Sequence, residues 1–343
     1  MKTNRSLLRN IFFNAFSFLK ALVFASSCYF FAFTLHALDC EFKKLTVLTK
    51  ATYMSNISWE HNALIKSLKK GLIEQAVSFN YNPTSLDDIG DVIFVPCDHK
   101  AVVQAVELKR QKRIKKLLVG PNIWPDEINY PEVDVYFVPS AWVIEFVHEL
   151  CPNMESRCKV WYAGVDQDFW KQSYNDYKYS KDVLVYWKTE GIAFCTAIEE
   201  LLINYGWNPV RLKYGSYNTE QYKNVLRNCR FAVFISRSES QGLALAECWS
   251  MDVPTLPWNP KSTVILGHQC DYVSSCPYLN DKLGKDWKTL NELEAILQSI
   301  DVFLFSCAPR EWVMNFMTDE VSVKELIKII NTELIETRYD VSY

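Results

Sequence analysis

Residues 230–259 read RFAVFISRSESQGLALAECWSMDVPTLPWN, and this stretch decides the fold class. The apolar run Phe231–Ile235 predicts a strand that ends at a polar loop. The loop ends at Gly242, where a helical pattern begins, and a second apolar run precedes Pro257. A strand, glycine turn, helix and strand in this order leave the first amides of the helix unpaired at its positive dipole end. The helix start is therefore predicted to be an anion site suited to a diphosphate.

Two carboxylates flank the predicted anion site. Glu239 lies in the loop and Glu247 on the first turns of the helix, with seven residues between them. Carboxylates repel phosphate and accept hydrogen bonds from hydroxyl groups, so a ligand that carries both a diphosphate and hydroxyls, a nucleotide-sugar, fits the pattern. Two Glu residues at this spacing also occur by chance on amphipathic helices. The ordered combination of strand, S-x-S-E-S-Q-G loop, helix and D-V-P-T-L run favours the ligand interpretation.

The segment resembles the E-x7-E signature of retaining glycosyltransferases with two Rossmann-like domains, the GT-B type. The resemblance implies that Glu239 contacts the donor sugar, that Glu247 holds ribose hydroxyls, and that the diphosphate binds backbone amides, which here belong to Gln241, Gly242 and Leu243. Two upstream stretches also resemble this family, a "VPS-x-W" motif at 138–142 and a "GVD" motif at 164–166. The resemblance covers residues 117–260 well and the first hundred residues only by pattern.

Cations are expected beside the diphosphate as well as amides. Members of the family usually carry a basic pair, commonly Arg and then Lys, after the first strand of the second domain. In this chain residues 187–191 read WKTEG, so Lys188 is the one cation there, and we expect Arg237 to supply the second charge. With Glu239, these two residues make up the predicted catalytic set. An ordinary exposed loop lysine is the alternative for Lys188.

The nucleobase is assigned by resemblance to the loop after the predicted strand 208–213. Gly215 permits a close backbone approach, and Tyr214 or Tyr217 is placed to stack on a base. A plain turn at the end of a strand explains these residues equally well.

The acceptor is expected to bind a loop of the first domain. Gly120 and Asn122 follow a predicted strand, and the Asn amide offers both a donor and an acceptor. His61 lies on a predicted helix from which it reaches the cleft, although a lone His is more often structural. Many family members carry a glycine-rich loop after the first strand, and residues 52–56, TYMSN, lack it.

The triplet Asp166-Gln167-Asp168 superficially matches the D-x-D metal motif of another glycosyltransferase fold. It lies in residues 164–182, a stretch rich in Tyr, Asp and Lys that has the composition of a linker, rather than after a strand, which favours a structural role. We therefore expect no metal and no other cofactor, because GT-B enzymes use helix dipoles and basic side chains instead.

The fold class predicted is α/β, with two Rossmann-like domains, a cleft between them and a C-terminal helix that crosses back to the first domain. Strands alternate with helices in both halves, which indicates parallel sheets. Strands are expected at 44–50, 76–79, 91–95, 115–120 and 133–138, then at 182–187 and 208–213. The predicted divisions are a leader at 1–40, a first domain at 41–168, a nucleotide-sugar-binding domain at 169–315, and a crossing helix and tail at 316–343.

The first forty residues form an apolar leader. Lys2, Arg5 and Arg9 lie at its start, and residues 21–38 are uncharged and long enough to span ~27 Å as a helix. An uncleaved anchor or a helix that lies in the membrane through residues 11–38 is the preferred interpretation, and a cleaved signal peptide stays open. A catalytic domain that faces the cytoplasm is expected, since the donor is there, whereas the positive-inside rule favours the other side.

Bulk composition excludes several classes of function. The 343 residues are 49% hydrophobic and 22% charged with a net charge of −3, so no nucleic-acid partner is expected. The 11 cysteines include no C-x-x-C pair, which argues against a zinc framework and mildly for a reducing compartment.

The function predicted is transfer of a sugar, with retention, from a nucleoside diphosphate-sugar to a hydroxyl of a glycan or lipid-linked acceptor. A protein that holds a nucleotide or glycan without turnover on the same scaffold is the alternative. An exported two-lobed binding protein, released by cleavage near Ala37, is a third possibility.

Overall fold

The structure is a computed structural model that describes residues 40–50, 62–173 and 176–340. The predicted apolar leader and His61 lie outside these residues. Within the described ranges no helix combines the length and the apolar character that a membrane crossing requires.

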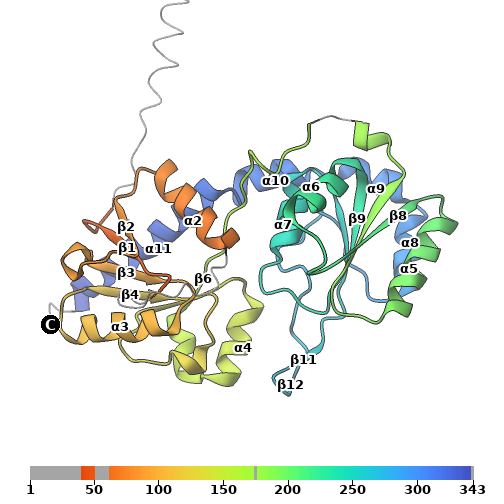
Figure 1. The fold of residues 1–343 in the computed structure, drawn as a ribbon. Helices are drawn as coiled ribbons and strands as arrows, with labels where there is room; N and C mark the ends of the chain where they lie inside the picture. The colour runs from red at the N-terminus through yellow and green to blue at the C-terminus, as the bar shows by residue number, and fades with distance from the viewer. Residues whose placement is uncertain (1–39, 51–61, 174–175, 341–343) are drawn as a thin grey trace, which may run out of the picture. The chain divides into compact units, whose positions relative to one another are not determined.

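The first sheet has six parallel strands in the order β2-β1-β3-β4-β5-β6 (Figure 1). Its four central strands are buried throughout, as expected for a parallel sheet covered on both faces. Helices α2 and α11 (Asp319–Asp340) cover one face, and α3 and α4 cover the other. The strands are β1 Leu45–Val47, β2 Phe79–Tyr81, β3 Val92–Val95, β4 Lys116–Val119, β5 Val135–Val138 and β6 Cys158–Val160; the helices are α2 Asn62–Glu74, α3 His99–Arg110 and α4 Trp142–Leu150.

The second sheet has four parallel strands in the order β10-β9-β7-β8. Helices α6, α7 and α10 pack on one face, while α5, α8 and α9 pack on the other. The predicted strands at 182–187 and 208–213 are confirmed to the residue. The elements are β7 Asp182–Trp187, α5 Ile192–Asn204, β8 Asn208–Lys213, α6 Thr219–Asn228, β9 Cys229–Ile235, α7 Leu243–Ser250, β10 Thr255–Trp258, α8 Leu290–Leu297, α9 Ile300–Ser306 and α10 Pro309–Phe316.

One predicted strand is misplaced. The sequence pattern predicts extended backbone at 76–79, but the chain turns at Ala76, where φ is 51°, and the strand begins at Phe79. The amide of Val77 donates to the carbonyl of Leu72 at 3.0 Å, which closes the end of α2. The apolar character of this segment therefore serves a helix end rather than a strand.

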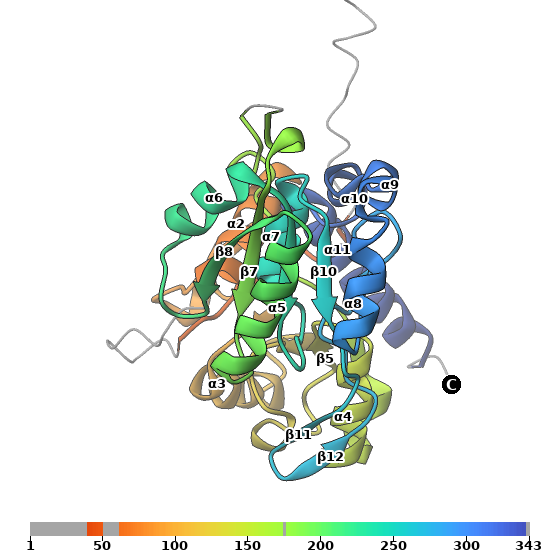
Figure 2. The ribbon, with the colours of Figure 1, turned by 90° about the vertical axis from the view of Figure 1, so that its right-hand side faces the viewer.

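A short hairpin was not anticipated. Strands β11 Thr263–Ile265 and β12 His268–Cys270 pair antiparallel beyond β10. The hairpin lies beside α4 (Figure 2), where Cys270 and Val273 pack against Phe146. This apolar cluster connects the second half of the chain to the first.

The C-terminal helix α11, Asp319–Asp340, packs against α2 of the first half. The indole of Trp161 donates to the carbonyl of Ser322 at 3.1 Å, which ties α11 to the end of the first sheet. The segment that connects the sheets runs from Val160 to Asp182, and the predicted boundary at 168/169 falls within it.

The chain passes twice between the two halves, and the two passages lie side by side. The amide of Val165 donates to the carbonyl of Met317 at 2.9 Å, and Val165 forms an isolated parallel bridge with Thr318. At Gly164 the backbones are so close that a Cβ atom would lie 2.5 Å from the Cα of Asp319. Only glycine fits this contact without displacing the start of α11.

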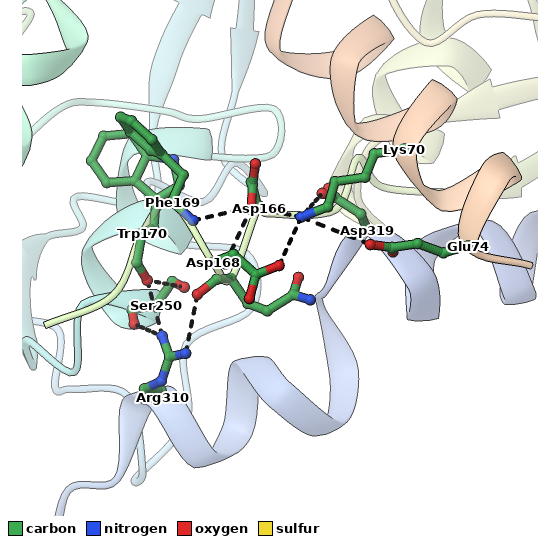
Figure 3. Close-up of polar contacts among 10 residues, drawn as sticks. Lys70, Glu74, Asp166, Asp168, Phe169, Trp170, Ser250, Arg310 and Asp319 are labelled. Atoms are coloured by element: carbon green, nitrogen blue, oxygen red, sulfur yellow. Dashed lines mark hydrogen bonds and ion pairs between the residues drawn. The ribbon is translucent and has the colours of Figure 1, made fainter. Parts of the chain in front are cut away.

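Lys70 of α2 binds this crossing from one side (Figure 3). Its ammonium group lies 2.6 Å from Asp166, 3.2 Å from Asp168 and 3.7 Å from the buried Asp319. Burial raises the pKa of Asp319 to about 6. The carboxylate of Asp166 also accepts the amide of Phe169 at 3.1 Å. These contacts agree with a structural role for the D-x-D triplet.

Candidate functional site

The predicted anion site is built around Gly242. This residue lies in the left-handed region, with φ 79° and ψ 57°, immediately before α7. A Cβ atom here would also come within 2.9 Å of Leu245, so both conformation and space favour glycine. The amides of Gln241, Gly242 and Leu243 donate to no residue in the described part of the chain. Three amides are thus available at the positive end of a helix.

A cavity of about 420 Å³, here called the Gly242 cavity, opens at these amides. Its lining from the second half comprises the loop 239–242, the start of α7 and the ends of β7 and β8. The first half contributes the start of α2 and the loops after β4 and β5, with Asn122 and Pro139. The carboxyl ends of strands from both sheets therefore face one cavity, the position where open α/β sheets bind ligands.

Glu239 and Lys188 form an ion pair in the Gly242 cavity. The ammonium of Lys188 lies 2.9 and 2.8 Å from the two carboxylate oxygens of Glu239, whose side chain is 14% exposed. The same ammonium lies 4.8 Å from the ring centre of Tyr214. Among the described lining residues Lys188 is the only cation. The ligand-free site is therefore electrically neutral at this point.

Arg237 is placed elsewhere. Its guanidinium pairs with the carboxylate of Glu190 at 2.5 and 3.0 Å and lies 5.4 Å from the ring centre of Trp258. It does not line the Gly242 cavity. The expectation that Arg237 supplies the second diphosphate charge does not fit this position, because its side chain turns from the loop toward the carboxylate of Glu190 and is paired there.

Glu247 lines a second cavity of about 800 Å³, here called the Lys70 cavity. Its carboxyl group makes no hydrogen bond or ion pair with any described residue. Burial raises its pKa to about 8. Leu243 lines both cavities, so the two cavities meet at the start of α7. Glu247 follows Leu243 by about one helical turn on the same helix. A partnerless carboxyl at a cavity wall is suited to bind hydroxyl groups of a ligand.

Replacing Glu247 with Gln is expected to stabilise the ligand-free protein at alkaline pH. A carboxyl whose pKa rises from 4.5 to about 8 on folding destabilises the folded state progressively between those pH values. The stability advantage of the variant should therefore grow from pH 5 to pH 8 and level off above it. Because the carboxyl borders a cavity, we expect roughly 1–2 kcal/mol, less than full burial would give. Urea unfolding at pH 5, 7 and 9 measures it, and parallel curves for variant and wild type would contradict it. The exposed Glu311→Gln serves as the control.

Two of the predicted donor-binding residues, Gln241 and Tyr217, use their side chains in structural contacts. The buried side chain of Gln241 binds both the amide and the carbonyl of Ala163, at 3.0 and 2.7 Å, so only its backbone faces the cavity. The hydroxyl of Tyr217 donates to Tyr186 at 2.9 Å, and burial raises its pKa to about 12. Neither Tyr217 nor Gly215 lines either cavity, whereas Tyr214 lines the Gly242 cavity. Tyr214 is therefore the tyrosine available for stacking.

Of the two predicted acceptor residues that the structure describes, one lines the Gly242 cavity and one does not. Asn122 lines the Gly242 cavity opposite α7. Gly120 is buried behind it, where a Cβ atom would lie 2.5 Å from the carbonyl oxygen of Phe137. No group of three His, Cys, Asp or Glu residues suited to a metal ion is found in the described ranges.

Ser140 and Trp142 belong to the site although the sequence did not single them out for a role. Both donate hydrogen bonds to the loop that carries Glu239. The "VPS-x-W" resemblance was the available signal, but it marked a domain end rather than a contact.

Comparisons with known proteins give the fold a context. No protein-family model matches the sequence, and no curated protein matches it either. Several solved structures are similar to this chain in fold. The catalytic domain of starch synthase IV from Arabidopsis thaliana, bound to ADP and acarbose, is 8% identical, with a TM-score of 0.58 over 85% of this chain and 99% of that one.

Two further structures are similar over nearly their full lengths. A glycosyltransferase from Rickettsia africae is 12% identical, with a TM-score of 0.53 over 85% of this chain and 98% of that one. The lipopolysaccharide outer core galactosyltransferase WaaB is 10% identical, with a TM-score of 0.52 over 86% of this chain and 100% of that one. At these identities the likeness is one of fold. It confirms the predicted two-domain Rossmann-like fold.

Proposed function

We propose that the chain is a glycosyltransferase that moves a sugar from a nucleoside diphosphate-sugar to a hydroxyl acceptor, with retention and without a metal. One observation carries the proposal. Unpaired amides at the start of α7 share a cavity with the Lys188–Glu239 ion pair. An anion and a polyhydroxyl group are the two chemistries that this combination binds.

The donor would divide the ion pair. Its diphosphate would accept hydrogen bonds from Lys188 and from the amides around Gly242, and the released Glu239 carboxylate would accept from hydroxyls of the donor sugar. Glu247 stands one helical turn away in the adjoining cavity, without a partner among the described residues. We assign the ribose hydroxyls to it. Lys188 and Glu239 would each gain a new partner in the donor, so separating the ion pair would leave neither charge without a partner.

The reaction proposed breaks the bond between the anomeric carbon and the diphosphate oxygen. The acceptor oxygen bonds to that carbon, and the acceptor proton passes to the leaving diphosphate, so the charges balance. Negative charge grows on the diphosphate as the bond breaks, which is where Lys188 and the helix start exert most of their effect. Asn122, which lines the same cavity, would orient the acceptor hydroxyl. The enclosing cavity walls limit hydrolysis by water.

A non-catalytic nucleotide-binding protein is the second candidate, and one observation favours it. The described lining of the Gly242 cavity holds a single cation, which Glu239 already neutralises. Such a site binds a diphosphate while giving less help to its departure.

Turnover decides between the two candidates. The purified protein is incubated with a panel of nucleotide-sugars and with glycan or lipid-linked acceptors, and release of nucleoside diphosphate is measured. Thermal shift identifies the donor beforehand, because a ligand that binds the folded state raises its melting temperature. NMR of the product gives the anomeric configuration, and inversion would overturn the retaining mechanism. Binding of a donor without release under any condition would favour the second candidate.

A further inference from the structure

Residues 139–142 of the first half bind the loop that carries Glu239 in the second half. The indole of Trp142 donates to the carbonyl of Glu239 at 3.0 Å. The hydroxyl of Ser140 donates to the carbonyl of Ser240 at 2.5 Å. In return the hydroxyl of Tyr278 donates to the carbonyl of Pro139. Three hydrogen bonds thus cross between the halves beside the Gly242 cavity.

Because a peptide group is planar, a hydrogen bond that fixes the direction of its carbonyl also fixes the direction of its amide. In a planar trans peptide the carbonyl and the amide point in opposite directions. The carbonyl of Glu239 shares its peptide with the amide of Ser240, and the carbonyl of Ser240 shares its peptide with the amide of Gln241. Holding both carbonyls toward the side chains of Ser140 and Trp142 therefore directs both amides away from these two side chains.

Those two amides are available to a ligand. Ser240 and Gln241 line the Gly242 cavity, and their amides donate to no residue in the ranges that the structure describes. They precede the amides of Gly242 and Leu243, so four successive residues with unpaired amides line one cavity. A run of unpaired amides of this kind binds anionic oxygen atoms.

The side chains that hold the carbonyls are themselves well placed. Ser140 is 1% exposed. Trp142 packs against the apolar cluster of Phe146, Cys270 and Val273, which the β11–β12 hairpin completes. Burial and packing keep both donors in position, and the hairpin thereby supports a contact at the cavity.

We propose that Ser140 and Trp142 are positioning residues that orient the amides of Ser240 and Gln241 toward the diphosphate of the donor. The inference rests on the proposed function and adds that the diphosphate site is complete only when the first half holds the loop. Without these bonds either peptide is free to rotate and present a carbonyl oxygen to the anion, which repels it.

The test uses inorganic pyrophosphate as the probe and isothermal titration calorimetry on the full chain. Ser140→Ala and Trp142→Phe each remove one donor and keep most of the side-chain volume. Each is expected to weaken pyrophosphate binding about tenfold, since one charge-assisted hydrogen bond is disturbed. Ser140→Thr keeps the hydroxyl and is expected to bind like the wild type.

Matched controls remove equivalent bonds elsewhere. Trp258→Phe deletes an indole bond to the carbonyl of Lys288 at 2.9 Å, and Ser250→Ala deletes a hydroxyl bond to the carbonyl of Trp170 at 2.8 Å. Both are expected to bind pyrophosphate within about twofold of the wild type, because neither bond touches the cavity loop. Circular dichroism checks each fold, and Ser140→Ala decides the outcome alone if Trp142→Phe unfolds.

Equal binding by wild type, Ser140→Ala and Trp142→Phe would overturn the inference, as would a wild-type chain that binds no pyrophosphate. The proposed function is judged separately by donor turnover. If pyrophosphate binding depends on Ser140 and Trp142 while no nucleotide-sugar is turned over, the inference stands and the transferase proposal fails.

Discussion

Glu239→Gln is expected to reduce sugar transfer by about a hundredfold or more in kcat/KM, because orientation of the reacting sugar carries effects of this size. The amide keeps the size of the side chain and removes the charge that accepts sugar hydroxyls. It also leaves Lys188 without the carboxylate that lies 2.8 Å from it in the ligand-free protein.

The same substitution should separate binding from chemistry. Lys188 no longer has to leave a carboxylate partner, so affinity for the nucleoside diphosphate alone is expected to stay equal or to increase. Calorimetry measures that affinity and coupled release of nucleoside diphosphate measures transfer. Glu311→Gln is the matched control, since Glu311 is an exposed carboxylate paired with Lys282. Undiminished transfer by the Glu239→Gln variant would remove this carboxylate from the mechanism.

Gly164→Ala is expected to lower the free energy of unfolding by about 3 kcal/mol, the upper range for overpacking. The added Cβ would lie 2.5 Å from the Cα and 2.6 Å from the amide nitrogen of Asp319, and 2.6 Å from the carbonyl oxygen of Thr318. All three are backbone atoms, so no side chain can rotate to make room. The two passages between the halves would have to separate.

Urea unfolding measures this loss. Gly191→Ala is the control, because Gly191 lies at the start of α5 with φ −67° and a Cβ there would meet nothing within 4 Å. Its stability should match the wild type closely. An equal unfolding midpoint for Gly164→Ala would show that the crossing is looser than the backbone contacts indicate.

The second sheet was the part of the fold most accessible to prediction. Strands β7 and β8 match their expected bounds because each is a continuous pattern that ends at clear turn residues. Prediction was poorest for β2, the β11–β12 hairpin and β6. These strands have three residues each, too few to show a period, and they exist because a neighbouring strand supplies hydrogen bonds.

In the site, too, the features that depend on neighbouring residues were predicted and those that depend on distant residues were not. Gly242 and the unpaired amides beside it were predicted because a glycine turn and a helix start are local events. The prediction that Arg237 contacts the diphosphate did not take account of its ion pair with Glu190, which lies 47 positions away in sequence. Arg237 is close to Glu239 in sequence, but its side chain points toward Glu190 and does not line the Gly242 cavity.

The amino-acid sequence by itself determined the strand–turn–helix unit at 229–250 and the alternation of strands and helices, since both depend on residues within a few positions of one another. Tertiary structure alone decided that Lys188 pairs with Glu239, 51 positions away, and that Trp142 holds the carbonyl of Glu239 from 97 positions away. Long-range partners are chosen by which surfaces the folded backbone brings into contact, and no local pattern encodes that choice.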